Sequence, residues 1–175
     1  YKNCKPMSLR EWNDLPYQSF FGLDFGFSND PAALIAIKAH NNRLYKHEIF
    51  YERGLTNPDI AERFERFGVT KEHEIYADSA EPKSIEELCQ MGYNVIPAVK
   101  GSDSIRAGIK FILSKENYYT ENSSNLIYEK DNYTYALDAN KEPTDKPIDK
   151  YNHLMDADRY GTYTKLAIDD PFFAL

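Results

Sequence analysis

Three aspartates, each at the end or the start of an expected regular element, are the residues best suited to chemistry in this sequence. Asp24 lies in FFGLDFGFSNDP and Asp78 in EIYADSAEPKSI, both at or near the end of a short apolar segment rich in β-forming residues. Asp156 lies in YNHLMDADRYGTY, where a helix is expected to begin. Carboxylates that converge on one crevice repel one another unless divalent cations lie between them. The pattern therefore predicts a two-metal site for phosphoryl transfer.

The residues around Asp156 extend this pattern along the expected helix. His153 lies three residues before Asp156 and Arg159 three residues after it, so all three share a helix face. Asp158 is two residues from Asp156 and is expected to point in another direction.

Length and composition indicate one globular domain. The chain has 175 residues, of which 42% are hydrophobic and 28% charged. No apolar run approaches the roughly 20 residues that a transmembrane helix needs, and no signal peptide is visible. Residues 1–18 are polar and irregular, so we expect a linker remnant of a longer protein there and the domain over residues 19–175.

Cysteine usage indicates the cellular compartment, and net charge indicates how strongly the domain binds DNA. Cys4 lies in the expected linker and Cys89 on the expected apolar face of a helix, and both are interpreted as free thiols in the cytoplasm. The net charge of −7 indicates that this domain alone binds DNA weakly. Bound cations would offset several acids, and local basic residues matter more than the total charge.

The first half of the chain is expected to form an antiparallel meander followed by a helix. Strands are predicted over residues 19–25, 32–40 and 43–52, and Asn41-Asn42 is typical of a tight hairpin turn. A helix is predicted over about 58–67, capped by Thr56 or Asn57 and ended by Gly68.

The second half is expected to alternate strands and helices. The predicted elements are a strand over 73–77, a helix over 82–91, a strand over 93–98, a helix over 103–115 and a last helix over about 152–165. An insertion over about 120–151 is predicted to contain a tyrosine-rich β-hairpin (NLIYEK and NYTYAL) and a charged loop over 138–151. Glu129 on this hairpin is expected to be solvated. The order of elements is that of the ribonuclease-H-like α/β fold, a mixed central sheet flanked by helices.

Five segments in this order resemble the C-terminal nuclease domain of the large terminase subunit, which tailed double-stranded DNA phages use to package their genomes. The segments are GLDFGFSNDPAA, YADSAEPKSIEEL, AVKGSDSIRAGI, NLIYEKDNYTY and NHLMDADRYGTY. The resemblance spans roughly residues 19–165. The sequence contains no G-x-x-x-x-G-K-[ST] loop, so the packaging ATPase half of that family is not part of it.

The resemblance implies a metal-dependent endonuclease that cuts concatemeric viral DNA with little sequence specificity. Asp24, Asp78 and Asp156 would hold two divalent cations, Mg²⁺ or Mn²⁺, and Asp24 on the central strand would bridge them. His153 would bind a cation, position the water or move a proton, unless it only caps the helix or satisfies the core.

Phosphate contacts are expected beside this site. The candidates are Lys83, Lys100, Ser102, Ser104 and Arg106. In AVKGSDSIR the start of the next helix would turn its free N–H groups toward an anion, unless this is an ordinary solvated loop. Such contacts hold the DNA backbone without reading bases.

The resemblance also implies partners and a compartment. These are double-stranded DNA, the N-terminal packaging ATPase domain of the same protein, the small terminase subunit and the portal or procapsid, in the host cytoplasm and without a membrane. Alternative interpretations remain: a junction resolvase or transposase core, an actin-like nucleotide-binding domain, or a non-catalytic portal or procapsid docking module.

Overall fold

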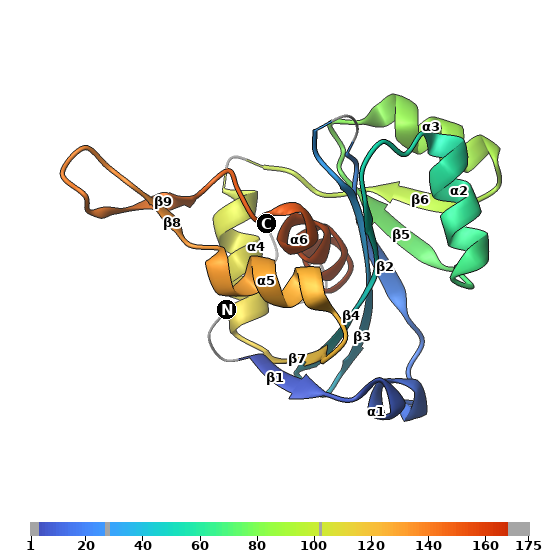
Figure 1. Ribbon diagram of the computed structural model, residues 1–175, viewed down its shortest axis with the longest axis horizontal. Coiled ribbons are helices and arrows are strands. Elements are labelled where there is room, and N and C mark those ends of the chain that lie inside the picture. Colours follow the sequence, from blue (N-terminus) through green and yellow to red (C-terminus); the bar gives the residue numbers. More distant parts are fainter. Residues whose placement is uncertain (1–3, 27–28, 102, 168–175) are drawn as a thin grey trace.

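The computed structural model describes residues 4–26, 29–101 and 103–167, which are built around a mixed sheet of seven strands (Figure 1). Across the sheet the strands lie in the order β1 (Cys4–Met7), β7 (Glu116–Thr120), β4 (Arg43–Glu52), β3 (Ala32–His40), β2 (Phe20–Asp24), β5 (Glu74–Ala77) and β6 (Asn94–Pro97). Strands β2, β3 and β4 form the antiparallel meander, and β5 joins β2 in parallel. The predicted ribonuclease-H-like sheet is confirmed.

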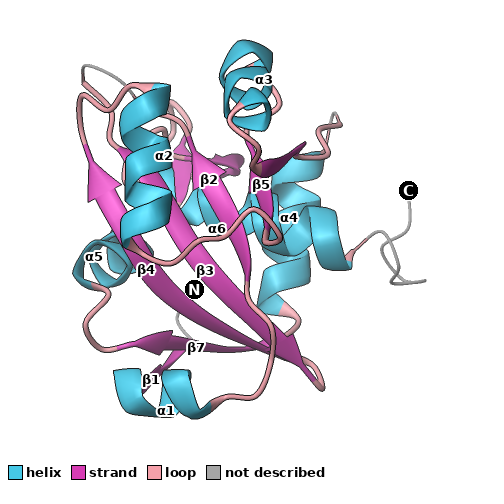
Figure 2. Cartoon of the chain, turned by 90° about the vertical axis from the view of Figure 1, so that its right-hand side faces the viewer, coloured by secondary structure: helices cyan, strands magenta, loops and turns pink. Residues whose placement is uncertain are grey.

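Helices cover both faces of the sheet (Figures 1 and 2). One face carries α2 (Asn57–Arg66) and α3 (Pro82–Gln90), and the other carries α4 (Ser104–Leu113), α5 (Ser124–Asn132) and α6 (His153–Leu166). Strand β3 is buried on both sides. Leu34 belongs to the core cluster under α2, whereas Ile35 and Ile37 belong to the cluster under α6. This explains the continuous apolar run in its sequence.

Local sequence signals act as expected in the first half. Asn41 and Asn42 have φ values of 45° and 64°, the left-handed conformation that a two-residue hairpin turn of the primed type requires. Thr56 caps α2 in a reciprocal capping box with Asp59. The predicted meander and first helix therefore match the observed elements to within one or two residues.

The expectation of a linker over residues 1–18 is wrong for the part that the structure describes. Strand β1 pairs in parallel with β7 at the edge of the sheet, and α1 (Leu9–Asp14) follows it with a capping box between Ser8 and Glu11. Trp12 is only 5% exposed. The Nζ atom of Lys38 donates to the carbonyl oxygen of Trp12 (2.9 Å) and lies 4.8 Å from the centre of its ring. Buried apolar residues as few and as widely spaced as Met7 and Trp12 leave no periodic pattern in a polar segment, so the sequence concealed these elements.

The tyrosine-rich insertion also differs from the prediction. The segment NLIYEK is not a strand, because it lies within α5, where Leu126 and Glu129 are three residues apart and both buried. The hairpin is formed instead by β8 (Tyr135–Leu137) and β9 (Pro143–Pro147), and it extends away from the sheet (Figure 1). Strand β7 was not predicted. It is polar, and its buried Asn117 is satisfied by the carbonyl oxygens of residues 112 and 115.

The two cysteines are free thiols, as predicted. Cys89 is exposed, however, so its expected place on the apolar face of α3 is wrong. The buried face of that helix is made by Ile85 and Leu88. Within the described ranges, no helix is long and apolar enough to span a membrane.

Helix α6 lies so close to β2 that backbone meets backbone. A Cβ atom on Gly22 would lie 1.8 Å from the carbonyl oxygen of Ala157. On the helix side, a Cβ atom on Gly161 would lie 3.3 Å from the Cα atom of Gly22 and 2.9 Å from Cδ1 of Ile37. Only a residue without a side chain fits at position 22, so this contact fixes the distance between α6 and the central strand.

The packing of α1 predicts that Trp12→Ala destabilises the chain. Loss of a buried indole at the sheet edge should lower the free energy of unfolding by about 3 kcal/mol. Chemical denaturation would measure the change, with Leu9→Ala on the exposed side of the same helix as the control. Equal stability of the two variants would contradict the docking of α1 and restore the linker interpretation.

Gly22→Ala should force α6 away from β2. Overpacking of this kind costs about 1–3 kcal/mol, and a clash with backbone cannot be relieved by a side-chain rotation. The matched control is Gly101→Ala, because a Cβ atom there would meet no atom within 4 Å. A stable Gly22→Ala variant with the midpoint of the parent chain would show that the close approach is not obligatory.

Candidate active site

Besides its close contact with β2 at Gly22, α6 is held by a buried ion pair with β4. The Nζ atom of Lys46 lies 2.6 Å from Oδ2 of Asp158 and 2.7 Å from Oδ1 of Asn117. Thr162 donates from its hydroxyl to the other oxygen of Asp158 at 2.8 Å. Asp158 therefore points into the protein, as predicted from its spacing. The opposite face of the helix is left for His153 and Asp156.

Asp24 ends β2 and is largely buried, with 14% of its side chain exposed. Nδ1 of His153 lies 3.0 Å from Oδ2 of Asp24. Burial raises the pKa of Asp24 to about 7, against the hydrogen bond from His153, and the negative charges of Asp156 and Asp78 contribute to the rise. The same hydrogen bond raises the pKa of His153. Asp24 thus experiences the charge of both other predicted acids.

Asp78 directly follows β5, the parallel neighbour of β2. It forms an ion pair with Lys100, and it accepts hydrogen bonds from the hydroxyl of Tyr160 (3.2 Å) and the backbone N–H of Ala80 (2.8 Å). Burial alone would raise the pKa of Asp78, but these three partners together lower it below its usual range. Asp78 is therefore held as a carboxylate.

Asp156 lies in the first turn of α6. Its Oδ1 accepts from Nη2 of Arg159 at 2.8 Å, and Asn152 lies 3.5 Å from its other oxygen. Arg159 is itself buried, and the negative charge of Asp156 raises the pKa of its guanidinium against the effect of burial. The helix face predicted from the spacing of His153, Asp156 and Arg159 is confirmed.

One cleft of about 540 Å³ is lined by all four predicted catalytic residues, Asp24, Asp78, His153 and Asp156. Parallel strands β2 and β5 end on the same side of the sheet, and α6 packs on the face of these strands (Figure 1), with its first turn at the cleft. The three carboxylates offer only oxygen donors, the type that Mg²⁺ and Mn²⁺ prefer. Each is engaged by its own basic partner. Within the described residues, no three acidic, histidine or cysteine side chains are arranged around one point as a bound ion would require. Asp24, Asp78 and Asp156 would be the residues that hold a cation at this cleft.

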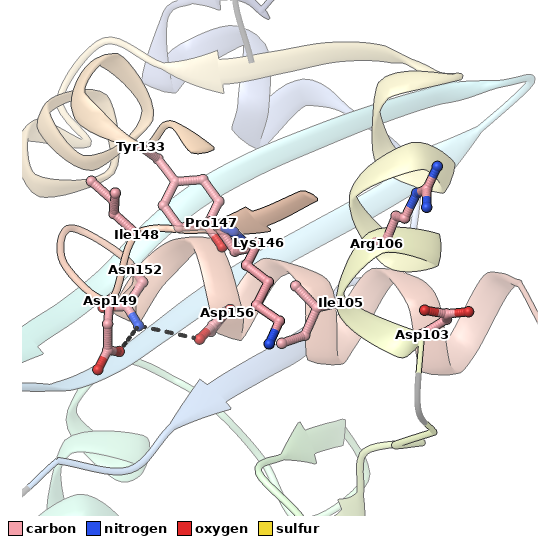
Figure 3. Close-up of a pocket in the computed structure, with 10 residues that line it drawn as sticks. All are labelled: Asp103, Ile105, Arg106, Tyr133, Lys146, Pro147, Ile148, Asp149, Asn152 and Asp156. Atoms are coloured by element: carbon pink, nitrogen blue, oxygen red, sulfur yellow. Dashed lines mark hydrogen bonds between the residues drawn. The ribbon is translucent and has the colours of Figure 1, made fainter. Parts of the chain in front are cut away.

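The predicted phosphate-binding residues lie in different places. Lys100 lies at the site through its ion pair with Asp78, and Lys83 is exposed on α3. Arg106 on α4 lines a neighbouring pocket of about 410 Å³, which also contains Asp156 and Lys146 of β9 (Figure 3). Ser104 is 8% exposed, which gives its side chain little access to a phosphate. Ser102 lies outside the described residues.

Glu129 was wrongly expected to be solvated. It is 1% exposed, and its carboxylate accepts from the hydroxyl of Tyr51 and from backbone N–H groups at the start of α6. Burial raises the pKa of Glu129, and these hydrogen bonds oppose the rise. The sequence signal that might have placed it inside is its spacing from Leu126 on a helix, but that segment was interpreted as a strand.

Comparisons with known proteins identify the family that this chain resembles. The family model described as the terminase RNAseH-like domain matches residues 24–162. The large terminase subunit of Bacillus phage SPP1 is 32% identical over 146 residues, which are 80% of this chain and 34% of that protein. The chain therefore spans about a third of the length of that relative.

Solved structures show the same relationship. The nuclease domain of the large terminase (g2p) of bacteriophage SPP1, a structure with bound Mn, has a TM-score of 0.82, with 26% identity over 93% of this chain and 96% of that chain. The large terminase nuclease of thermophilic phage G20c, with bound magnesium, has a TM-score of 0.60 and covers 83% of this chain and 80% of its own. Its 17% identity shows a shared fold alone. The chain belongs to the ribonuclease-H-like nuclease domain family of the phage terminase large subunit, as its sequence resemblance predicted.

Proposed function

We propose that this chain is a divalent-metal-dependent endodeoxyribonuclease that cuts concatemeric viral DNA during genome packaging. The observation that carries the proposal is the meeting of Asp24, Asp78 and Asp156 in one cleft, at the edge where two parallel strands end. A carboxylate as deeply buried as Asp24, beside two further acids, is poorly stabilised unless positive charge lies nearby. The nuclease domain of SPP1 carries manganese, which supports a cation here.

Each acid has a distinct position in the proposed site. Two Mg²⁺ or Mn²⁺ ions, when bound, supply an activated water and stabilise the leaving oxygen of the phosphodiester. Asp24 on the inner strand would be shared between the ions, with Asp78 and Asp156 as the further carboxylates that would hold them. His153 orients Asp24 through Nδ1, and its Nε2, which lies 3.8 Å from Oδ1 of Asp30, is the atom assigned to hold or move a proton.

Double-stranded DNA is the proposed substrate, held by its backbone. Lys100 at the cleft, Arg106 in the adjoining pocket and Lys83 on α3 are the basic residues assigned to phosphates. No base-reading element was recognised in the sequence, so cutting should depend little on sequence. We place choice of site with the small terminase subunit and the packaging ATPase domain of the same protein. The portal or procapsid is the assembly that receives the DNA, in the host cytoplasm.

The metal-dependent activity can be tested by plasmid cleavage with Mn²⁺, Mg²⁺, Ca²⁺ or EDTA. We expect nicking and linearisation with Mn²⁺ or Mg²⁺ only. Asp24→Asn, Asp78→Asn and Asp156→Asn should each reduce the rate on the order of 100-fold or more, because metal ions supply several kcal/mol of transition-state stabilisation.

The control for these variants is Asp14→Asn, an equal change of charge on α1, where the carboxylate is exposed. All variants should first be shown to fold by circular dichroism. Cleavage that persists in EDTA, or that is indifferent to Asp24→Asn and Asp156→Asn in folded protein, would refute the nuclease assignment of this cleft.

Arg106→Ala should weaken DNA binding without a change in metal binding. Loss of one phosphate contact is expected to reduce the slope of log K against log salt concentration by about 1, equally for unrelated DNA sequences. Fluorescence anisotropy at several salt concentrations in Ca²⁺ would measure it. Arg10→Ala on exposed α1 is the control of equal charge. An unchanged slope for Arg106→Ala would remove this residue from the DNA path.

A further inference from the structure

The first turn of α6 carries His153 and Asp156 but has no side-chain cap of its own. Asn152 occupies the N-cap position and makes no capping hydrogen bond. Its amide instead lies near Asp149 and Asp156, at 3.4 and 3.5 Å (Figure 3). The first N–H groups of a helix have no acceptor within the helix, so those of α6 need an acceptor from another element.

Glu129 of α5 supplies that acceptor. Its Oε2 accepts from the N–H groups of Leu154 at 2.7 Å and Met155 at 3.4 Å. Its Oε1 accepts from the N–H group of His153 at 3.2 Å and from the hydroxyl of Tyr51 at 2.9 Å. Both carboxylate oxygens are thus used at the positive end of α6, where a negative charge is most stabilising.

Helix α5 is held in the same way by the central sheet. Ser123 gives it no side-chain cap, and Glu48 of β4 accepts from the N–H groups of Asn125 (2.9 Å) and Leu126 (3.0 Å). Strand β4 therefore holds the start of α5, and α5 holds the start of α6. Tyr51 of β4 completes the connection through its bond to Glu129.

We propose that Glu129 is a positioning residue for the nuclease site, which caps α6 from α5 and thereby sets the placement of His153 and Asp156 against Asp24. The proposal rests on the proposed function for its effect on cleavage, but not for its effect on α6. The bond to the N–H group of His153 is direct, and Asp156 lies three residues further along the same turn. Displacements of about 1 Å in such residues can cost 100-fold in rate.

Glu129→Gln tests this role with little change in volume. An amide has one acceptor oxygen, and its NH₂ group would face backbone donors, so the first turn of α6 should loosen. We expect faster hydrogen–deuterium exchange over residues 153–156 and weaker Mn²⁺ binding by calorimetry. The value of kcat for plasmid cleavage should fall by about 10- to 100-fold, the usual effect of removing a group that orients metal ligands. The KM for DNA should stay unchanged, because the basic residues assigned to phosphates are not displaced.

The control is Thr162→Val, which also removes a buried hydrogen bond of α6 but on the side that faces Asp158. It should lower the thermal midpoint without faster exchange over residues 153–156 and without loss of kcat. Glu129→Asp keeps the charge and should retain more activity than Glu129→Gln, which also covers the case in which the amide variant folds poorly.

Three outcomes separate the possibilities. Unchanged exchange in the first turn of α6 for Glu129→Gln would overturn the positioning role, whatever the activity of the parent chain. Equal kcat for Glu129→Gln and Thr162→Val at equal stability would overturn it too. Absence of metal-dependent cleavage in the parent chain would refute the proposed function, while the exchange measurement would still decide the role of Glu129 in α6.

Discussion

Helix α6 can lie directly against β2 because neither Gly22 nor Gly161 has a side chain where the two elements cross. The remaining arrangement at this edge of the sheet depends on that contact. With α6 one side chain further away, His153 would not reach Asp24, and Asp156 would leave the cleft. The apolar residues Leu154, Met155 and Ala157 then bury the helix against the sheet, so the approach is stabilised along its length.

Charges are arranged around this helix in matched pairs. Lys46 with Asp158 and Arg159 with Asp156 lie on different faces of α6, and His153 with Asp24 joins the helix to the end of β2. Lys100 pairs with Asp78 beside the helix, which reaches Asp78 through the hydroxyl of Tyr160. A buried ion pair is seldom a large net source of stability, because both partners lose water. Its value here is geometric, since each pair fixes one side chain. The cleft thus keeps three acids close together without any of them being unpaired.

The ion pairs of the three acids also affect how these acids would bind cations. Cations held by Asp24, Asp78 and Asp156 would share these acids with His153, Lys100 and Arg159. All three basic side chains lie beside the acids. The overall charge of −7 is therefore less informative than the local pairing, in which Asp24, Asp78 and Asp156 each contact a basic side chain.

The amino-acid sequence was enough to predict the meander, the parallel strand–helix units, the three aspartates and the shared face of His153 and Asp156. These features depend on short-range rules: apolar periodicity, capping residues, turn residues and helical spacing. The other features depend on contacts between distant parts of the chain. Strands β1 and β7 exist because distant polar strands pair at the sheet edge, and NLIYEK is helical because its own Leu126 and Glu129 are buried on one face of α5. Glu129 contacts α6 only in the folded chain. A polar side chain can be buried when groups of other elements form hydrogen bonds with it. The local sequence contains no pattern from which those groups could be predicted.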